Sequence, residues 1–274
     1  MLRCTRNMAA IRKKLNARAH GEQMAGAYKI ILNRIPRVFL SSKPFVPFLS
    51  SIQMTSIYDE TYTEVLRVAQ GIVVVRTAGD GRIDSAMKEG PFLEELKRQL
   101  LAAHPTWDVQ ISPPRAACDV MINGIRVNLK LTDCKTSDNA ANKPSIFYSI
   151  TGITTYKYSS CWNDFLAKLQ EAKTRGEIKR TRDRTTEYHY LVKNKLTGAV
   201  LFKPIFDIHT YVSNPSNDLQ INWKHEFENA AYVTTEDKYI EKVGALIAAI
   251  QKSVQEMIAR TRLFAEADIS ALLR

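Results

Sequence analysis

An Asn-Gly pair at residues 123–124 is the feature that most constrains how this chain folds. A two-residue type I′ turn needs positive φ at both central positions, and Asn followed by Gly is the pair that most readily adopts it. Apolar and polar residues alternate on both sides of the pair, as they do in two strands that each bury one face. The sequence therefore predicts a β-hairpin over residues 117–131, in which Asp119 faces Asn128.

The two faces of this predicted hairpin differ in chemistry. Side chains alternate with period two along a strand, so one face is entirely apolar and consists of Val120, Ile122, Ile125, Val127, Leu129 and Leu131. The other face carries Asp119, Met121, Arg126, Asn128 and Lys130. Cross-strand neighbours have Cβ atoms about 5 Å apart, so a carboxylate and an amide could share one cation, with an ammonium group beside it. Mg²⁺ suits such oxygen ligands. A hairpin that is simply solvated is the alternative interpretation.

The spacing of these residues resembles a known signature. Asp119, eight further residues and then Asn128-Leu129-Lys130 are similar to the motif of the PD-(D/E)xK nuclease superfamily, the fold of most type II restriction endonucleases. The family core is a helix, a strand, a catalytic hairpin, a helix and a further strand. Candidates occur here in that order: a helix over residues 86–103, a strand over Trp107–Ile111, the hairpin over 117–131, a helix over Cys161–Thr174 and a strand over Glu187–Asn194.

The resemblance covers roughly residues 80–225 and implies the fold class. We expect an α/β (α+β-like) protein with a restriction-endonuclease-like core, in which helices flank a central mixed β-sheet. A long C-terminal packing helix is expected at about residues 236–265, because apolar residues there step by three and four. These residues are Ile240, Val243, Ile247, Ile250, Val254 and Met257.

The motif departs from the family pattern at two positions. Cys118 stands where the family often has proline, a position that varies within it. Asn128 stands where the family has its second acidic residue, although some restriction enzymes carry Asn or Gln there. An amide oxygen still binds Mg²⁺ but brings no negative charge, so the metal would be held more weakly. A nuclease core that has lost its activity is the alternative.

Glu89 is the residue predicted to supply the missing charge. Glu89 and four apolar residues share one face of the predicted helix: Phe92, Leu93, Leu96 and Leu100. Family members often place a helix glutamate over the catalytic hairpin, and Glu89 is the position that matches. A glutamate near a helix N-terminus also complements the helix dipole, so a purely structural role remains open.

The resemblance implies a Mg²⁺-dependent, sequence-specific double-stranded DNA endonuclease of the type II restriction class that leaves 5′-phosphate ends. The expected catalytic residues are Asp119, Asn128 and Lys130, and the expected metal ligands are Asp119, Asn128 and Glu89. Cutting both strands of a palindromic site favours a homodimer. No organic cofactor is expected. A structure-specific or repair nuclease and a non-cleaving DNA-binding protein are the alternatives.

Three stretches are candidates for DNA contact, each with a solvated loop as the alternative. Residues 132–145 offer Lys135, Asn139, Asn142 and Lys143 after the hairpin. Residues 173–184 are a basic run with Arg180, Arg182 and Arg184, which suits phosphate contact. Gln220 and Asn222 are predicted to point outward together from a short strand whose inward residues are Leu219, Ile221 and Trp223.

The basic charge of the chain lies in its first 57 residues, which hold ten Lys and Arg and one acid. This segment is interpreted as a DNA-binding arm, a targeting peptide or an extension upstream of a start at Met54. Residues 58–274 are expected to form one nuclease domain. Prolines at 36, 44 and 47 favour a linker between the two.

Cysteine and histidine patterns add little chemistry. The four cysteines form no CxxC pair and no zinc spacing, so reduced thiols in the cytoplasm of a prokaryotic or viral host are expected. His189 and His209 are interpreted as structural residues, with a catalytic role as the alternative. No apolar run approaches the roughly 18 residues of a membrane span, so no membrane association is expected.

Overall fold

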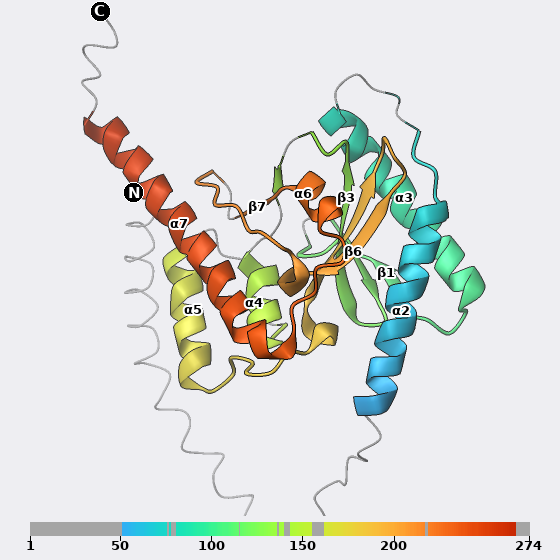
Figure 1. Cartoon of the computed structure of the whole chain (residues 1–274), viewed down its shortest axis with the longest axis horizontal. Coiled ribbons are helices and arrows are strands. Elements are labelled where there is room, and N and C mark those ends of the chain that lie inside the picture. The colour runs from blue at the N-terminus through green and yellow to red at the C-terminus, as the bar shows by residue number, and fades with distance from the viewer. Residues whose placement is uncertain are drawn as a thin grey trace, which may run out of the picture. The chain divides into compact units, whose positions relative to one another are not determined.

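The computed structural model describes residues 51–75, 77, 81–114, 116–135, 137–139, 143–154, 162–216 and 219–266. Five strands form one mixed β-sheet in the order β1-β2-β3-β5-β6 (Figure 1). Their bounds are β1 Val109–Ile111, β2 Val120–Ile122, β3 Ile125–Thr132, β5 Tyr188–Asn194 and β6 Val200–Pro204. Neighbouring strands are antiparallel except β3 and β5, which run parallel.

The Asn-Gly hairpin forms as predicted. Asn123 and Gly124 both have positive φ, 48° and 83°. The register places Val120 opposite Val127 and Met121 opposite Arg126. The Asn123 side chain also fixes the turn to its surroundings, because its Nδ2 donates to Thr61 Oγ1 at 2.9 Å and its Oδ1 accepts from the backbone amide of Asp108 at 3.0 Å. This side-chain anchoring explains why the turn residue is asparagine and not simply any residue that tolerates positive φ.

Two helices, α2 (Ser51–Gly71) and α3 (Gly81–Ala103), cover one face of the sheet (Figure 1). The apolar face of the hairpin packs against them, and its six residues are all buried. From α3 the cluster receives the predicted stripe of Phe92, Leu93, Leu96 and Leu100. The helix α2 starts at Ser51, so it crosses the boundary expected between residues 57 and 58. The N-terminal segment before it lies outside the described residues.

The opposite face of the sheet is covered by α4 (Lys143–Thr151), α5 (Trp162–Thr174) and α7 (Tyr239–Glu266). Figure 1 shows these helices on the other side of the sheet from α2 and α3. The smaller elements are a second sheet of β4 (Asp138–Asn139) and β7 (Gln220–Ile221), the helix α6 (Trp223–Glu228) and three 3-10 turns, η2 (Arg184–Thr186), η3 (Ile205–Asp207) and η4 (Glu236–Lys238). The chain is thus a mixed α/β protein with helices on both faces of its sheet.

The predicted order of core elements is confirmed, with one local correction in the stretch 132–145. The stretch 132–145 was expected to be a loop, yet β4 occupies two of its residues and α4 begins within it at Lys143. Every residue of α4 is buried, so the segment lacks the polar face by which a surface helix is detected.

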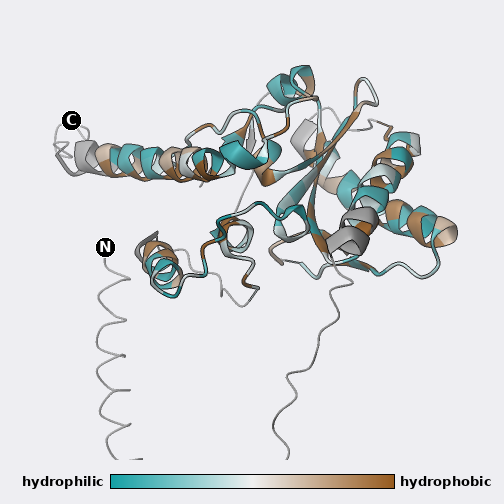
Figure 2. Cartoon of the chain, turned by 60° about the horizontal axis from the view of Figure 1, so that its bottom comes forward, coloured by the Kyte–Doolittle hydropathy of each residue, from teal (hydrophilic) through white to brown (hydrophobic). Residues whose placement is uncertain are grey.

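The long C-terminal helix is confirmed as α7, and Figure 2 shows polar and apolar residues alternating along it. However, the buried side of α7 does not coincide with the row of apolar residues that the sequence predicts to be buried. Ile240 and Met257 are 49% and 38% exposed, whereas Tyr239 and Leu246 are fully buried. Among the described helices, none combines the length and apolar character needed to cross a bilayer.

His189 of β5 is a buried histidine on the α2 side of the sheet, as its structural interpretation requires. Its Nδ1 lies 3.0 Å from the carbonyl oxygen of Glu187, which can only accept, so Nδ1 carries the proton. Its Nε2 then accepts from the Tyr58 hydroxyl at 2.8 Å. Burial lowers the pKa of His189 to about 3, so the ring is neutral in the folded protein.

This histidine predicts an acid-sensitive fold. The unfolded chain binds a proton at His189 near pH 6.5, whereas the folded chain does so only near pH 3, so stability is lost as the pH falls between these values. We expect His189 alone to lower the free energy of unfolding by about 1.4 kcal/mol for each pH unit below roughly pH 6. Thermal melting of the wild type and of His189→Gln from pH 7.5 to pH 5 measures the difference. Equal slopes in both proteins would contradict it.

Candidate active site

Asp119 and Asn128 meet on the polar face of the hairpin, as predicted from their register. The backbone amide of Asp119 donates to the carbonyl oxygen of Val127 at 2.9 Å, so the residue just before β2 stays hydrogen-bonded to β3. The Asp119 Oδ2 atom accepts from Asn128 Nδ2 at 2.8 Å and from the backbone amide of Leu129 at 2.7 Å. These two donors leave Oδ1 as the carboxylate oxygen with no hydrogen bond to any described residue.

The side-chain oxygen of Asn128 is a buried polar atom of this cluster without a partner among the described residues. Asn128 Oδ1 is buried and accepts no hydrogen bond within the described part of the chain. Leaving a buried acceptor without a partner costs about 1–3 kcal/mol, so such an atom normally contacts a water, an ion or a bound group. Because Nδ2 already faces Asp119, Oδ1 is the Asn128 atom available to an added ligand.

Lys130 completes the trio on the same face of β3. It is half-buried and makes no hydrogen bond or ion pair with the residues that the structure describes. Burial raises the pKa of the Asp119 carboxyl, while the Leu129 amide and the positive charge of Lys130 oppose this rise. The ammonium group therefore acts on the carboxylate through space and keeps its N–H donors available.

Tyr188 forms the neighbouring part of this face, which the sequence did not reveal. It lies beside Arg126 in the parallel pairing of β3 and β5, and its hydroxyl donates to the carbonyl oxygen of Ala117 at 2.8 Å. Ser145 of α4 donates to the same carbonyl at 3.1 Å. Burial first, and the nearby charge of Asp119 second, raise the pKa of Tyr188, so the phenol stays protonated. Tyr188 thus holds the chain just before Asp119 in place.

The predicted ligand role of Glu89 stays a prediction. This residue is half-buried on α3, whose buried side chains pack against the apolar face of the hairpin. Asn128 and Lys130 point from the opposite face of the same strand. Among the described residues, no three His, Cys, Asp or Glu side chains come together as a metal site. The assembled trio therefore holds one carboxylate, and the packing of α3 gives the predicted ligand role of Glu89 no support.

The residues predicted for DNA contact in the stretch 132–145 have different environments. Lys135 is exposed. Asn139 lies in β4, where its register partner is Gln220 of β7, so the structure brings two predicted contact residues together from distant parts of the chain. Lys143 is only 4% exposed, which contradicts its expected place on a solvated loop. Asn142 lies outside the described residues.

The outward strand predicted around residues 219–223 is largely confirmed. Leu219, Ile221 and Trp223 are buried, while Gln220 is half-buried and Asn222 is exposed. Asn222 has a structural task as well, because its Oδ1 accepts from the backbone amide of His225 and so caps the N-terminus of α6. An asparagine at this position satisfies one of the amides that a helix start leaves free.

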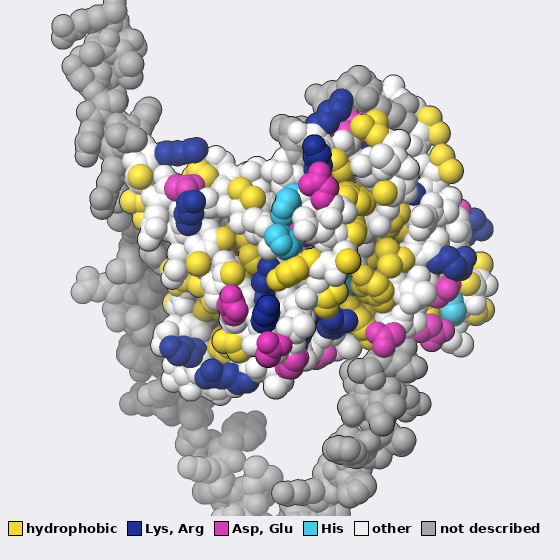
Figure 3. Space-filling view, in the orientation of Figure 1, with side chains coloured by type: hydrophobic (Ala, Val, Ile, Leu, Met, Phe, Trp, Pro, Cys, Tyr) yellow, Lys and Arg dark blue, Asp and Glu magenta, His cyan; other side chains and the backbone are white. Residues whose placement is uncertain are grey.

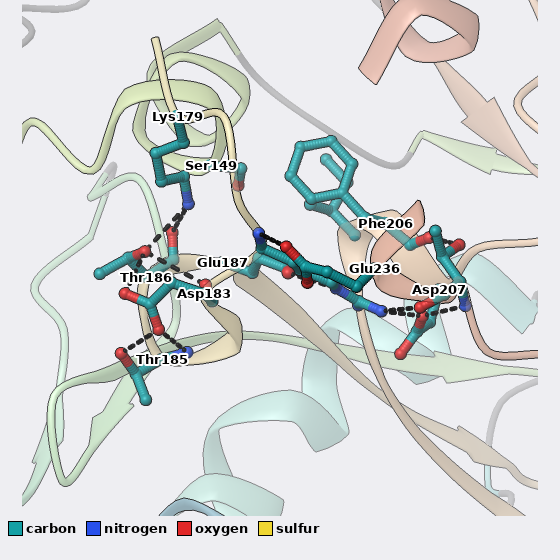
Figure 4. A network of polar contacts seen from close by, with 12 residues as sticks. Ser149, Lys179, Asp183, Thr185, Thr186, Glu187, Phe206, Asp207 and Glu236 are labelled. Atoms are coloured by element: carbon teal, nitrogen blue, oxygen red, sulfur yellow. Dashed lines mark hydrogen bonds and ion pairs between the residues drawn. The ribbon is translucent and has the colours of Figure 1, made fainter. Parts of the chain in front are cut away.

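Arg182 contradicts the interpretation of the basic run as a row of phosphate contacts. Its side chain is 4% exposed and lies between two carboxylates, with Nε 2.8 Å from Glu187 Oε1 and Nη1 2.8 Å from Asp207 Oδ1. The carbonyl oxygen of Thr234 accepts from the same Nη1. Figure 4 shows the two carboxylates, Glu187 and Asp207, within this network. The arginine is a structural ion-pair partner.

The other two arginines of the run remain accessible. Arg180 is exposed, and Arg184 is half-buried in η2. Figure 3 shows Lys and Arg side chains interspersed with acidic ones across the visible face, without one continuous basic surface. Any nucleic-acid contact on this face would therefore use separate basic positions.

Comparison with known proteins returns no match to any protein-family model, any curated protein or any solved structure. The assignment of chemistry to this site therefore depends on its geometry and on the motif in the sequence.

Proposed function

We propose that this protein is a Mg²⁺-dependent DNA endonuclease built on a restriction-endonuclease-like core. The observation that carries the proposal is the meeting of Asp119, Asn128 and Lys130 on one polar face, with Asn128 Oδ1 buried and unpartnered among the described residues. The order of elements supports it further, because a helix, a strand, the hairpin, a helix and a strand parallel to β3 follow one another as in that superfamily.

The donor atoms fit a weakly held Mg²⁺. Asp119 Oδ1 and Asn128 Oδ1 are hard oxygen atoms without a hydrogen bond to the described residues. Mg²⁺ in nucleotide-processing sites is typically bound through one or two carboxylates, with water and substrate phosphate completing its shell. This site offers one carboxylate, the smaller of these two numbers, together with one neutral amide oxygen. We therefore expect millimolar rather than micromolar Mg²⁺ to be needed.

Asp119 and Lys130 then have different roles in the proposed reaction. Asp119 provides the negative charge that holds the metal against the polar face of the hairpin. Lys130 orients the attacking water and stabilises the negative charge that develops on phosphorus. The bound metal would supply an acidified water molecule and neutralise charge on the phosphate. Attack of water on phosphorus would break the P–O3′ bond, and the 3′ oxygen would leave with a proton from solvent, which gives 5′-phosphate and 3′-hydroxyl ends.

For the substrate we propose double-stranded DNA cut at a specific sequence, as in type II restriction enzymes, by a homodimer whose two sites address the two strands. A repair or structure-specific nuclease with the same core is the second candidate, and a non-cleaving DNA-binding protein is the third. Asn128 is the observation that favours the third, because it removes a charge from the metal site.

Plasmid digestion distinguishes these candidates. The full-length protein is incubated with supercoiled plasmid in Mg²⁺ or in EDTA, and the products are separated by electrophoresis. Discrete bands in Mg²⁺ alone support the sequence-specific endonuclease, whereas nicks confined to cruciform or branched DNA support the structure-specific enzyme. Retarded but intact plasmid under both conditions would overturn the endonuclease proposal.

Asn128→Asp should strengthen metal binding. The substitution adds a second carboxylate beside Asp119, so we expect half-maximal cleavage at about tenfold lower Mg²⁺. Without metal the same variant loses the 2.8 Å hydrogen bond from Asn128 Nδ2 and places two like charges together, so its melting temperature should fall below that of the wild type. Mg²⁺ titration of cleavage and of melting measures both. A higher Mg²⁺ requirement would contradict the ligand role of Asn128.

A further inference from the structure

Arg126 is a cation on the site's face of β3 that the proposed chemistry does not use. It lies two residues before Asn128, so both side chains project from the same face of the strand. Its Cζ lies 4.2 Å from the centroid of the Tyr148 ring in α4. The guanidinium makes no hydrogen bond or ion pair with any residue that the structure describes.

This environment suits a guanidinium that binds an anionic ligand. A half-buried charge is normally paired with an opposite charge, and among the residues that the structure describes the ring of Tyr148 is the group that compensates it. A ring face holds the guanidinium plane but leaves the N–H groups at its edge free. Those N–H groups match the oxygen atoms of a phosphate in a bidentate arrangement.

The spacing along β3 places this group beside the proposed reaction. Side chains two residues apart on a strand are about 6–7 Å apart, so Arg126 and Lys130 flank Asn128 on either side. Lys130 is the cation whose charge acts on the Asp119 carboxyl, whereas Arg126 is not among the groups that shift the pKa of Asp119. Their positions on either side of Asn128 suit contacts to two different phosphates.

We propose that Arg126 forms a phosphate-binding subsite for the nucleic-acid backbone, next to the phosphodiester held at Asp119 and Asn128. Tyr148 is a positioning residue, because it orients the guanidinium without contacting the phosphate. The place of this subsite relative to the cleaved bond depends on the proposed function. Its ligand class, a backbone phosphodiester, does not.

The test measures binding of a mixed-sequence 25-base-pair DNA duplex in EDTA, where no cleavage occurs, at several salt concentrations. Arg126→Ala should weaken binding about tenfold and lower the slope of log K against log salt by about one phosphate contact. Arg126→Lys keeps the charge, so it should retain the slope and lose less affinity. Tyr148→Leu should weaken binding, and Tyr148→Phe, which keeps the ring face, should restore it.

Arg98→Ala is the matched control. It removes one guanidinium from the exposed side of α3, where Arg98 pairs with Glu95 at 2.6 Å and lies on the far side of the sheet from Asn128. Its affinity and slope should equal those of the wild type. Unchanged binding by Arg126→Ala, equal losses in both arginine variants, or a wild type that does not bind the duplex would each overturn the subsite. A wild type that binds but never cleaves in Mg²⁺ refutes the endonuclease alone.

Discussion

Asp119→Asn is expected to abolish Mg²⁺-dependent DNA cleavage while the protein keeps its fold and its affinity for DNA. The asparagine has the shape of the aspartate and can still accept from the Leu129 amide, an interaction of 2.7 Å in the native chain. It removes the one carboxylate of the Asp119–Asn128–Lys130 trio, and with it the charge that attracts the metal. We expect the cleavage rate to fall at least about 100-fold. Single-turnover digestion of linear DNA measures this loss.

Two companion variants separate the metal from the lysine. Lys130→Ala should lower cleavage to a similar extent without changing the Mg²⁺ concentration that gives half of the remaining activity, because in the proposed site Lys130 is assigned to water and phosphate and not to the metal. Glu89→Gln should cleave normally if the trio is sufficient, since α3 covers the opposite face of the sheet. Full activity of the Asp119 variant would refute the assignment of the active site.

Arg182→Ala is expected to destabilise the fold by about 3–5 kcal/mol, the usual cost of leaving buried carboxylates without their cation. Glu187 and Asp207 are both buried, and their shared partner also binds the carbonyl oxygen of Thr234. Burial already raises the pKa of Glu187 while Arg182 opposes the rise. In the variant the Glu187 pKa therefore rises further, and the folded chain takes up a proton that the unfolded chain releases.

The pH dependence of this variant follows from the raised pKa of Glu187 in its folded state. A carboxyl whose pKa is higher in the folded than in the unfolded state favours folding as the pH falls, so the damage from Arg182→Ala should be smaller at pH 5 than at pH 8. Urea unfolding at both values measures it. Arg180→Ala, an exposed neighbour, should change stability by no more than about 0.5 kcal/mol. If Arg182→Ala weakens DNA binding and leaves stability intact, the phosphate-contact interpretation of this arginine is right after all.

The sequence predicted local structure well wherever a short pattern carried the signal. The register of the hairpin followed from the two residues of its turn, and the contact between Asp119 and Asn128 followed from the register. Period-two alternation identified the buried face of β3 for the same reason. Each of these inferences needed only residues within a few positions of one another.

The errors arose where a residue's environment depends on distant parts of the chain. The periodicity of α3 identifies its buried side but not which face of the sheet the helix covers, so the ligand role of Glu89 stays a prediction. The basic run contains no sign that Arg182 has a buried partner in Asp207, 25 residues further along. The role of Tyr188 follows from its parallel alignment with β3, and α4 escaped detection because all of its residues are buried.

The parallel pairing of β3 with β5 also orders events during synthesis. As Thr132 leaves the ribosome, α2, α3 and the hairpin are already available, so the nascent chain can begin to bury its first apolar cluster, which Leu191 of β5 and Phe202 of β6 complete later. β3 and β5 are separated by 55 residues, and closing so long a loop costs entropy before any contact repays it. The half of the molecule that carries Tyr188 is thus the last to assemble. A nascent chain released before that point has the apolar face of its hairpin largely covered, whereas the polar face still lacks β5 beside it.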